Sequence, residues 1–354
     1  MAVIKINFQF ETKISKKNLS ILCRQISFML QSGISISKAL EILAGQSQNK
    51  NLKIILSDIH KNILEGKSFS QCLLQHGKKF PALMINMIKA GENAGRLDEI
   101  MNQLADYYQQ ENDFITDFKR AMIYPCIVCV MMLTVLVMAL TFVIPSYAQM
   151  FSQNCAKLPL LTQIVIGISN FVGKYYLLLI LFFITIFILL VLFLKTDKGQ
   201  IFYGKFLFSS FVKKIYRIRL NFIFAQIFGM LLRSGVDIIS VFENVKDVVG
   251  NKFLDKDFDL MINQIRNGES VSEVINKSCK FNTILSEMIN VGENSGNLPD
   301  TMFYCQKYFE NEFKDSLKKL EKIIEPTFTI ITGIILGIIM LAIMEPTFTL
   351  NDIF

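Results

Sequence analysis

The sequence predicts an all-α membrane protein with two homologous cytoplasmic six-helix bundles and three transmembrane helices. Three observations lead to this fold class. A unit of about 125 residues is written twice, which marks an internal duplication. Three stretches are long and apolar enough to cross a bilayer. No segment alternates apolar and polar residues over a useful length, so strand signals are absent from the sequence.

The duplication is clearest in an octet. The stretch Ala90–Leu97 reads AGENAGRL, and VGENSGNL follows at Val291–Leu298. The two copies align at an offset of 202 up to the loop before Phe80 and Phe281, and at 201 from these phenylalanines onward, because one residue is lost in that loop. Other matched pairs are Ser32-Gly33 with Ser234-Gly235, Gly66 with Gly268, Pro125 with Pro326, and Pro145 with Pro346.

The membrane prediction rests on three uncharged stretches, residues 121–156, 175–194 and 326–344. About twenty apolar residues suffice to cross a bilayer core as a helix. Residues 195–219 hold seven Lys or Arg, whereas 145–173 hold only Lys157. Cytoplasmic loops are the ones enriched in Lys and Arg, so both large polar regions are predicted to face the cytoplasm. The basic excess beside the membrane also accounts for the net charge of +7 without nucleic acid.

These patterns divide the chain into eight segments. The expected segments are a short N-terminal extension (1–17), bundle 1 (18–120), transmembrane helix 1 (121–145), a short extracytoplasmic loop (146–170), transmembrane helix 2 (171–195), bundle 2 (196–324), transmembrane helix 3 (325–345) and an extracytoplasmic tail (346–354).

Each polar region reads as a string of helices separated by glycine, serine and proline. In the first copy an apolar stripe predicts a helix that Gly33 ends. Ser35 caps the next helix, a third runs to Gly66, Ser68 opens a fourth, and Pro81 lies in the first turn of a fifth. A sixth helix begins near residue 97 and is expected to continue into the membrane. The second copy repeats this order from residue 220.

No catalytic, cofactor or metal site is predicted. Gly66-Lys67-Ser68 resembles the end of a phosphate-binding loop, but Lys61 stands where that loop needs glycine, and Glu269 replaces Lys67 in the second copy. No Ser/His/Asp or Cys/His set occurs in both copies, so the chain is expected not to be an enzyme. Of the seven cysteines only Cys155 is placed outside the cytoplasm and membrane, which argues against a structural disulfide.

The Gly-Glu-Asn-x-Gly element is the strongest local signal, and it supports two interpretations. In the first it is a helix-to-helix corner: the glycines allow close backbone approach, and the Glu and Asn side chains bond backbone groups freed at the end of the fifth helix. In the second, Glu92 and Glu293 face a partner protein or an ion. The candidate residues are Gly91, Glu92, Asn93, Gly95, Gly292, Glu293, Asn294 and Gly296. Replacing Gly95 or Gly296 by Val is expected to overpack the corner.

Gly333 and Gly337 form a GxxxG inside the third predicted span. This spacing lets transmembrane helices approach closely, which makes the pair a candidate for self-association. The first span has Met132 and Leu136 at the equivalent places, so the motif is not part of the repeat. No Asp, Glu, Lys or Arg lies near the middle of any predicted span, which argues against an ion or proton pathway.

The chain resembles the inner-membrane platform proteins of type II secretion and type IV pilus systems, the secretion-system protein F family. The resemblance covers roughly residues 18–350 and rests on the doubled Gly-Glu-x-x-Gly-x-Leu, the doubled Ser-Gly and the prolines flanking spans one and three. It implies a non-enzymatic, homo-oligomeric scaffold of the bacterial inner membrane. Such a scaffold binds a cytoplasmic assembly ATPase, pilins or pseudopilins, and other inner-membrane assembly proteins.

A membrane transporter or channel component is the alternative function. It would require polar residues along the spans or inverted repeats, whereas both copies are predicted to share one orientation. A membrane-anchored enzyme would require a catalytic set repeated in both copies. The sequence does not separate pilus assembly, a competence pseudopilus and secretion.

Overall fold

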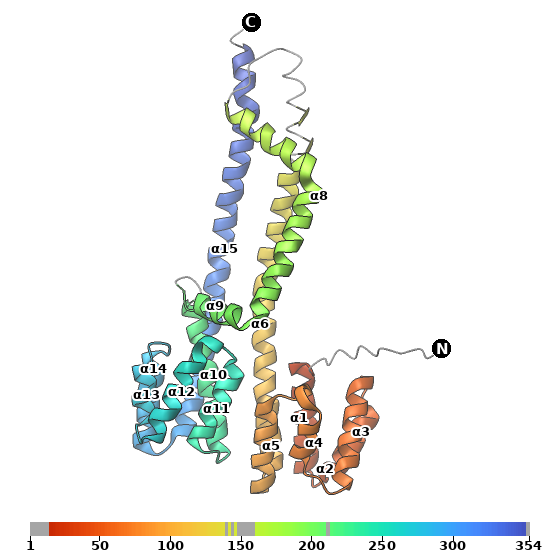
Figure 1. Cartoon of the computed structure of the whole chain (residues 1–354), viewed down its shortest axis with the longest axis vertical. Helices are drawn as coiled ribbons and strands as arrows, with labels where there is room; N and C mark the ends of the chain where they lie inside the picture. The colour runs from red at the N-terminus through yellow and green to blue at the C-terminus, as the bar shows by residue number, and fades with distance from the viewer. Residues whose placement is uncertain (1–13, 139–140, 143–144, 147–159, 210–212, 352–354) are drawn as a thin grey trace, which may run out of the picture. The chain divides into compact units, whose positions relative to one another are not determined.

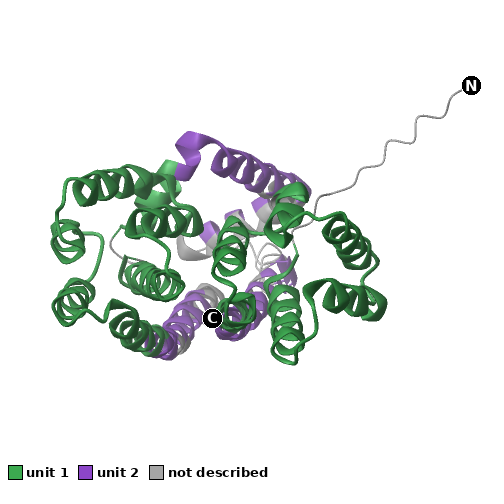
Figure 2. Ribbon diagram, turned by 90° about the horizontal axis from the view of Figure 1, so that it is seen from below, with its two compact units in different colours: residues 1–116, 201–313 green, residues 117–200, 314–354 purple. Residues whose placement is uncertain are grey.

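The structure, a computed structural model, describes residues 14–138, 141–142, 145–146, 160–209 and 213–351, apart from some side chains late in the chain and in the apolar helices. Every regular element in these residues is helical (Figure 1). The chain divides into two compact units, coloured separately in Figure 2. Unit 1 comprises residues 1–116 and 201–313, and unit 2 comprises residues 117–200 and 314–354. Both polar copies therefore belong to unit 1.

The first copy contains the six α-helices that the sequence predicts. They are α1 (Lys16–Gln31), α2 (Ile36–Gln46), α3 (Lys50–Leu64), α4 (Phe69–Gln75), α5 (Ala82–Ala94) and α6 (Leu97–Met138), with a short 3₁₀ turn at Gly77–Lys79. Ser35 and Ser68 cap α2 and α4 by accepting backbone N–H bonds, and Gln71 completes a capping box with Ser68. Pro81 immediately precedes the first residue of α5 and occupies its N-cap position, so its expected place inside the first turn was wrong by one residue.

The second copy repeats this order. Its helices are α10 (Lys213–Arg233), α11 (Ile238–Val249), α12 (Lys252–Arg266), α13 (Val271–Lys277), α14 (Thr283–Ser295) and α15 (Leu298–Asn351). The connection between α4 and α5 spans residues 76–81, whereas that between α13 and α14 spans 278–282, which accounts for the change of offset. The duplicated Gly33 and Gly235 have φ of 80° and 78°, so the same left-handed turn ends α1 and α10.

Two features distinguish the second copy. Helix α10 begins at Lys213, seven residues before the expected Leu220. An additional helix, α9 (Asp197–Leu207), precedes α10 and lies outside the repeat, so the region 196–324 holds more than the six expected helices. The core of this copy is aromatic: Phe224 stacks on Phe228, and the ring of Phe242 meets both edge to face.

Among the described residues, two helical stretches are long and apolar enough to cross a membrane, residues 97–135 and 213–233. The first contains the beginning of expected span 1, and its most apolar part is almost entirely exposed. The second is α10, whose most apolar part is two-thirds buried inside unit 1, and it is the core helix of the second copy. Two helices of similar hydropathy therefore differ in their surroundings, because the apolar part of α6 is exposed whereas that of α10 is covered by protein.

The other expected spans fall on α8 (Leu160–Lys195) and α15, whose side chains are described only in part. Helix α8 begins eleven residues before the expected start of span 2 at residue 171. Helix α15 runs on to Asn351, through most of the region expected to be a tail. Most of the expected loop, residues 147–159, lies outside the described residues. Pro125 lies inside α6 without ending it.

Candidate functional site

The first Gly-Glu-Asn-x-Gly corner joins α5 to α4. The Glu92 carboxylate accepts bonds from the backbone N–H of Phe69 at 2.5 Å and of Ser70 at 3.2 Å. The Ser70 hydroxyl donates a third bond, with an Oγ–Oε2 distance of 2.5 Å. The N–H groups in the first turn of a helix have no partner within it, and the helix dipole makes that end positive. The carboxylate therefore satisfies the N-terminus of α4 from another helix.

The second corner has the same geometry. Glu293 accepts bonds from the backbone N–H of Val271 at 2.7 Å and of Ser272 at 3.1 Å, and from the Ser272 hydroxyl at 2.5 Å. Both carboxylates lie at the start of the helix before their own (α4 and α13), not at the backbone groups freed where α5 and α14 end. Sequence alone could not place them, because the contact joins residues more than twenty apart. Asn93 and Asn294 are exposed, and the Asn294 amide donates to Asn290.

The glycines of the corner fall into two pairs. A Cβ built on Gly91 would lie 2.7 Å from Cγ1 of Ile100, and one on Gly292 would lie 2.9 Å from Cδ2 of Leu298. Gly95 and Gly296 have φ of 67° and 69°, and a Cβ there would meet nothing within 4 Å. The expectation that Val at Gly95 or Gly296 would overpack the corner was therefore wrong. These glycines provide the left-handed turn after the helix, and their missing Cβ faces open space.

A polar seam between the two copies was not predicted. Gln110 of α6 accepts bonds at its Oε1 from Nε2 of Gln226 (α10) at 2.5 Å and of Gln306 (α15) at 2.7 Å. The Ser234 hydroxyl donates to Oε1 of Gln103 at 3.2 Å. In the sequence, the detectable feature of this seam was a row of uncharged polar residues, glutamines and a serine, along helix faces. A polar row of this kind is typical of a helix face that packs against another polar surface.

A buried carboxylate marks one end of this seam. The side chain of Glu111 is only 7% exposed and lies 3.5 Å from Arg219 of the second copy and 3.9 Å from Lys16 of the first. The Arg219 guanidinium lies over the ring of Phe114, 3.6 Å from its centroid. Burial lowers the pKa of Arg219, and the nearby Glu111 carboxylate opposes that shift. Removing one partner of such a buried pair leaves an uncompensated charge, which typically costs about 3–5 kcal/mol.

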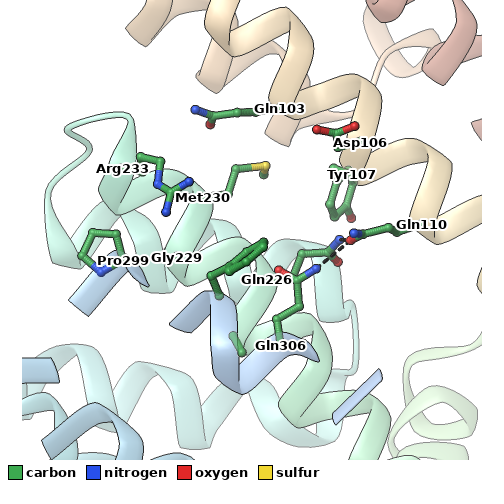
Figure 3. Close-up of a pocket in the computed structure, with 12 residues that line it drawn as sticks. Gln103, Asp106, Tyr107, Gln110, Gln226, Gly229, Met230, Arg233, Pro299 and Gln306 are labelled. Carbon is green, nitrogen blue, oxygen red and sulfur yellow. Dashed lines mark hydrogen bonds between the residues drawn. The ribbon is translucent and has the colours of Figure 1, made fainter. Parts of the chain in front are cut away.

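A half-open cavity of about 170 Å³ lies in the seam (Figure 3). Figure 3 shows side chains of α6 on one side and side chains of α10 and α15 on the other. The lining residues include Gln103, Asp106, Tyr107, Gln226, Met230 and Gln306. Arg233, also in the lining, is paired with Asp300 at 2.5 Å. Most of the exposed lining surface is apolar, so the cavity offers room for a side chain but no set of groups that would activate a substrate.

The remaining candidates for chemistry are structural in the described residues. Gly66, with φ of 94°, ends α3, and the Lys67 ammonium donates to Oδ1 of Asn62 at 2.5 Å. No group of three or more potential metal ligands occurs in the part of the chain that the structure describes. Cys23 and Cys305 are free and buried, and burial raises the pKa of both thiols, that of Cys305 to about 12.

Gly333 and Gly337 lie on an exposed face of α15 in unit 2. A Cβ on either would meet nothing within 4 Å, so the described chain places no helix against this face. Elsewhere in unit 2, Met131 and Val135 of α6 and Ile335 of α15 line an apolar cavity of about 220 Å³.

Comparison with known proteins agrees with the duplicated architecture. The family model described as Type II secretion system (T2SS), protein F matches residues 22–145 and again residues 224–346. The chain is 28% identical over 338 residues to the type IV pilus assembly protein PilC of Thermus thermophilus, covering 94% of this chain and 82% of that protein. It is 27% identical over 345 residues to the type II secretion system protein F of Pseudomonas aeruginosa, covering 97% and 85%.

The chain therefore belongs to the type II secretion system protein F family. This is the family of the non-enzymatic inner-membrane platform proteins of type IV pilus and type II secretion systems. The family resemblance predicted from the sequence is confirmed, and so is the internal repeat.

The role of the corner carboxylates can be tested with two substitutions on one helix. Glu293→Gln removes the charge that holds the N-terminus of α13, and we expect it to lower the free energy of unfolding by about 1–3 kcal/mol. Glu287→Gln, at an exposed position of α14, is the matched control and should change stability by less than about 0.5 kcal/mol. Thermal unfolding of the full-length chain in detergent provides the measurement. Equal stability of both variants would contradict the anchoring role.

The two kinds of corner glycine should respond differently to alanine. Gly91→Ala places a Cβ against Ile100, and we expect a loss of about 1–3 kcal/mol from overpacking. Gly95→Ala places alanine in the left-handed region and should cost about 1–2 kcal/mol through backbone strain alone. The control is Gly45→Ala in α2, where open space surrounds the site and alanine should be neutral or stabilising by up to about 1 kcal/mol.

A second substitution separates packing from strain. Adding Ile100→Ala to Gly91→Ala removes the Cγ1 atom at the contact. The double variant should therefore recover part of the loss relative to the sum of the two single variants, whereas Ile100→Ala should add its full cost to Gly95→Ala. Recovery in both backgrounds, or in neither, would show that the two glycines do not play distinct roles.

Proposed function

We propose that this chain is the inner-membrane platform of a type IV pilus, competence pseudopilus or type II secretion machine. In this role it couples a cytoplasmic assembly ATPase to the extraction of pilins or pseudopilins and to filament assembly. The supporting comparison is the family match over both copies of the repeat, together with relatives named for pilus assembly and for secretion.

One structural observation carries this proposal. Helices α6 and α15 each run without interruption from a bundle core into an apolar, exposed segment. In α6, Leu104 is fully buried and Met131 is 67% exposed, and in α15, Phe309 is fully buried and Met340 is 60% exposed. A continuous helix resists bending, so a rotation or shift imposed on a bundle is passed along it. This is the mechanical property that coupling requires.

The topology belongs to the proposal as well. We propose three spans within α6, α8 and α15, with both bundles in the cytoplasm and the membrane-proximal Lys and Arg contacting lipid headgroups. Exposed apolar side chains such as Phe182 and Leu189 on α8 and Ile330 on α15 support the assignment. The expected boundaries 121–145, 171–195 and 325–345 describe the part of each helix that lies within the bilayer.

The partners follow from the same assignment. We propose that the assembly ATPase engages the exposed surface of the bundles, and that pilins and other inner-membrane assembly proteins contact the spans. The corner carboxylates Glu92 and Glu293 are already bonded to helix N-termini, which supports a structural role in place of ion or partner binding. The open face of Gly333 and Gly337 is available for association between spans of neighbouring molecules.

The topology can be tested by cysteine accessibility in intact cells. The background replaces Cys126, Cys129, Cys155 and Cys279 by alanine. We expect a membrane-impermeant maleimide to label Gln153→Cys and to leave Gln48→Cys and Asn267→Cys, both exposed in the bundles, unlabelled until the cells are opened. Labelling of either bundle probe in intact cells would contradict the topology and, with it, ATPase contact.

The coupling role can be tested by deletion and replacement in the host. Loss of the chain should abolish surface filaments or secretion, and the full-length chain should retain the assembly ATPase on an affinity column. Lys67→Ala should restore assembly fully, and the purified chain should hydrolyse no ATP above background, because Lys67 only bonds Asn62. Assembly that persists without the chain, or ATP turnover that Lys67→Ala abolishes, would refute the proposal.

A further inference from the structure

The seam is formed by different faces of the two copies, so it is not symmetric. The face of α6 that carries Gln103, Gln110 and Glu111 packs on α10 and α15 of the second copy. The equivalent face of α15, 201 residues later, carries Tyr304, Asn311 and Glu312. If the two copies were related by a two-fold axis, this second face would pack on α1 of the first copy. It does not, because Tyr304 is 65% exposed and Asn311 is also exposed.

The complementary face of the first copy is exposed too. The seam residues of α10 and of the position that follows it are Arg219, Gln226, Met230 and Ser234. A shift of 202 places their counterparts at Lys17, Arg24 and Phe28 of α1 and at Ser32, its C-cap. These four counterparts follow one stripe of α1 at helical spacing, and each is exposed, Phe28 to 72%. Each copy therefore exposes the half of the seam that the other copy has buried.

A carboxylate stands at the equivalent position of the second face. Glu312 is the counterpart of Glu111, and its side chain is partly exposed, with Oε2 covered by its own chain and without a hydrogen-bond partner among the described residues. Glu111 is paired with Arg219 across the seam. A cation docked on the second face would supply the pairing that Glu111 has across the seam. The counterpart of Arg219 is the exposed Lys17, which carries the required positive charge.

We propose that the seam is repeated between molecules: the α1 face of one chain (Lys17, Arg24, Phe28 and Ser32) docks on the α15 face of another (Tyr304, Lys307, Tyr308, Asn311 and Glu312). The occupant of the exposed α15 face is thus a second copy of this chain. The contact is heterologous, with different surfaces on the two sides, so it builds a head-to-tail ring or filament and not a two-fold dimer.

The equivalent contacts are chemically compatible. The bond from Ser234 to Gln103 becomes a pair of hydroxyls, Ser32 and Tyr304. The amide of Asn311 takes the place of Gln110 and faces Arg24. The Arg24 guanidinium donates to Asn102 and Asp106 of its own copy, and its five N–H groups leave a further donor for the Asn311 oxygen. Phe28 replaces Met230 and meets an aromatic face formed by Tyr304 and Tyr308. These faces combine exposed aromatic and charged groups, the composition typical of interfaces between proteins.

The match does not extend to the edge of the seam. There the Asn86 amide donates to Oδ1 of Asn244, at 2.9 Å, between α5 and α11. The counterparts of this pair are Glu287 and Ile42, which cannot form the same bond. The contact between molecules is therefore centred on α1 and α15. The inference rests on the proposed function in one respect, that both bundles lie on the same side of the membrane.

A cysteine pair copied from a contact within the chain tests the proposal. Ser32→Cys and Tyr304→Cys, both exposed, are introduced into the full-length chain from which Cys126, Cys129, Cys155 and Cys279 have been removed. Oxidation in membranes should give a ladder of covalent species extending beyond the dimer. Each single variant alone should remain monomeric, and co-expression of the two single variants should stop at the dimer.

A matched pair provides the control. Ser234→Cys with Gln103→Cys occupies the corresponding contact within one chain and should cross-link internally, without a ladder, which shows that the oxidant reaches the seam. If this control reacts while the Ser32–Tyr304 pair does not, the proposal is wrong. Dimerisation by Ser32→Cys alone, as efficient as that of the pair, would show a two-fold contact through α1 and would also refute it.

A charge exchange tests the role of Glu312. Lys17→Glu places two carboxylates in contact and should lower the cross-linked fraction on the order of tenfold, as should Glu312→Lys, and the double exchange should restore it. Lys256→Glu, at an exposed position of α12, is the control and should have no effect. Failure of the exchange to restore cross-linking would exclude the Glu312–Lys17 contact. Neither assay needs an ATPase or pilin, so its outcome is independent of whether the chain supports assembly.

Discussion

The arrangement of the two copies depends on a carboxylate buried between them. Glu111 belongs to the first copy, but its closest positive partner, Arg219, belongs to the second. If the two copies separated, Arg219 would lose this carboxylate and Glu111 would keep only Lys16 of its own copy, at 3.9 Å. Loss of one partner from a buried ion pair is costly, so the pair favours the contact between the copies. The stacking of Arg219 on Phe114 and the pair of bonds to Gln110 fix the position around this ion pair. Specific polar contacts of this kind select one relative position of the packed helices. Apolar contacts alone would allow several such positions.

A fixed register between the copies matters for the proposed coupling. A movement of one bundle reaches the other only if the surface between them does not slip. The polar seam provides that constraint in unit 1, and the continuous helices α6 and α15 carry it onward from the bundle cores. The seam uses different faces of the two copies, that of α6 from the first and that of α10 and α15 from the second.

The two copies have diverged in how they use the same helices. Helix α1 has one buried stripe and exposes Arg24 and Phe28, whereas α10, its counterpart, is buried almost all round. The difference follows from position, because α10 packs on its own bundle and on α6 of the first copy at the same time. Helix α6 and helix α15 differ in the opposite sense, with Tyr107 buried and its counterpart Tyr308 partly exposed. Equivalent helices thus have different neighbours in the two copies. The faces of α1 and α15 that remain exposed are the ones on which the proposed second molecule docks.

Much of the fold follows from the sequence alone. The duplication, the order of helices and the positions of Gly33, Gly66 and Gly95 at helix ends are local properties, set by apolar periodicity, caps and left-handed glycines. Only the tertiary structure decided that Glu92 and Glu293 anchor the preceding short helix, that Gly95 faces open space, and that a polar seam joins the copies. Each of these depends on contacts between residues distant in the chain. A sequence pattern records which residues share a helix face, but it does not record which surface that face meets.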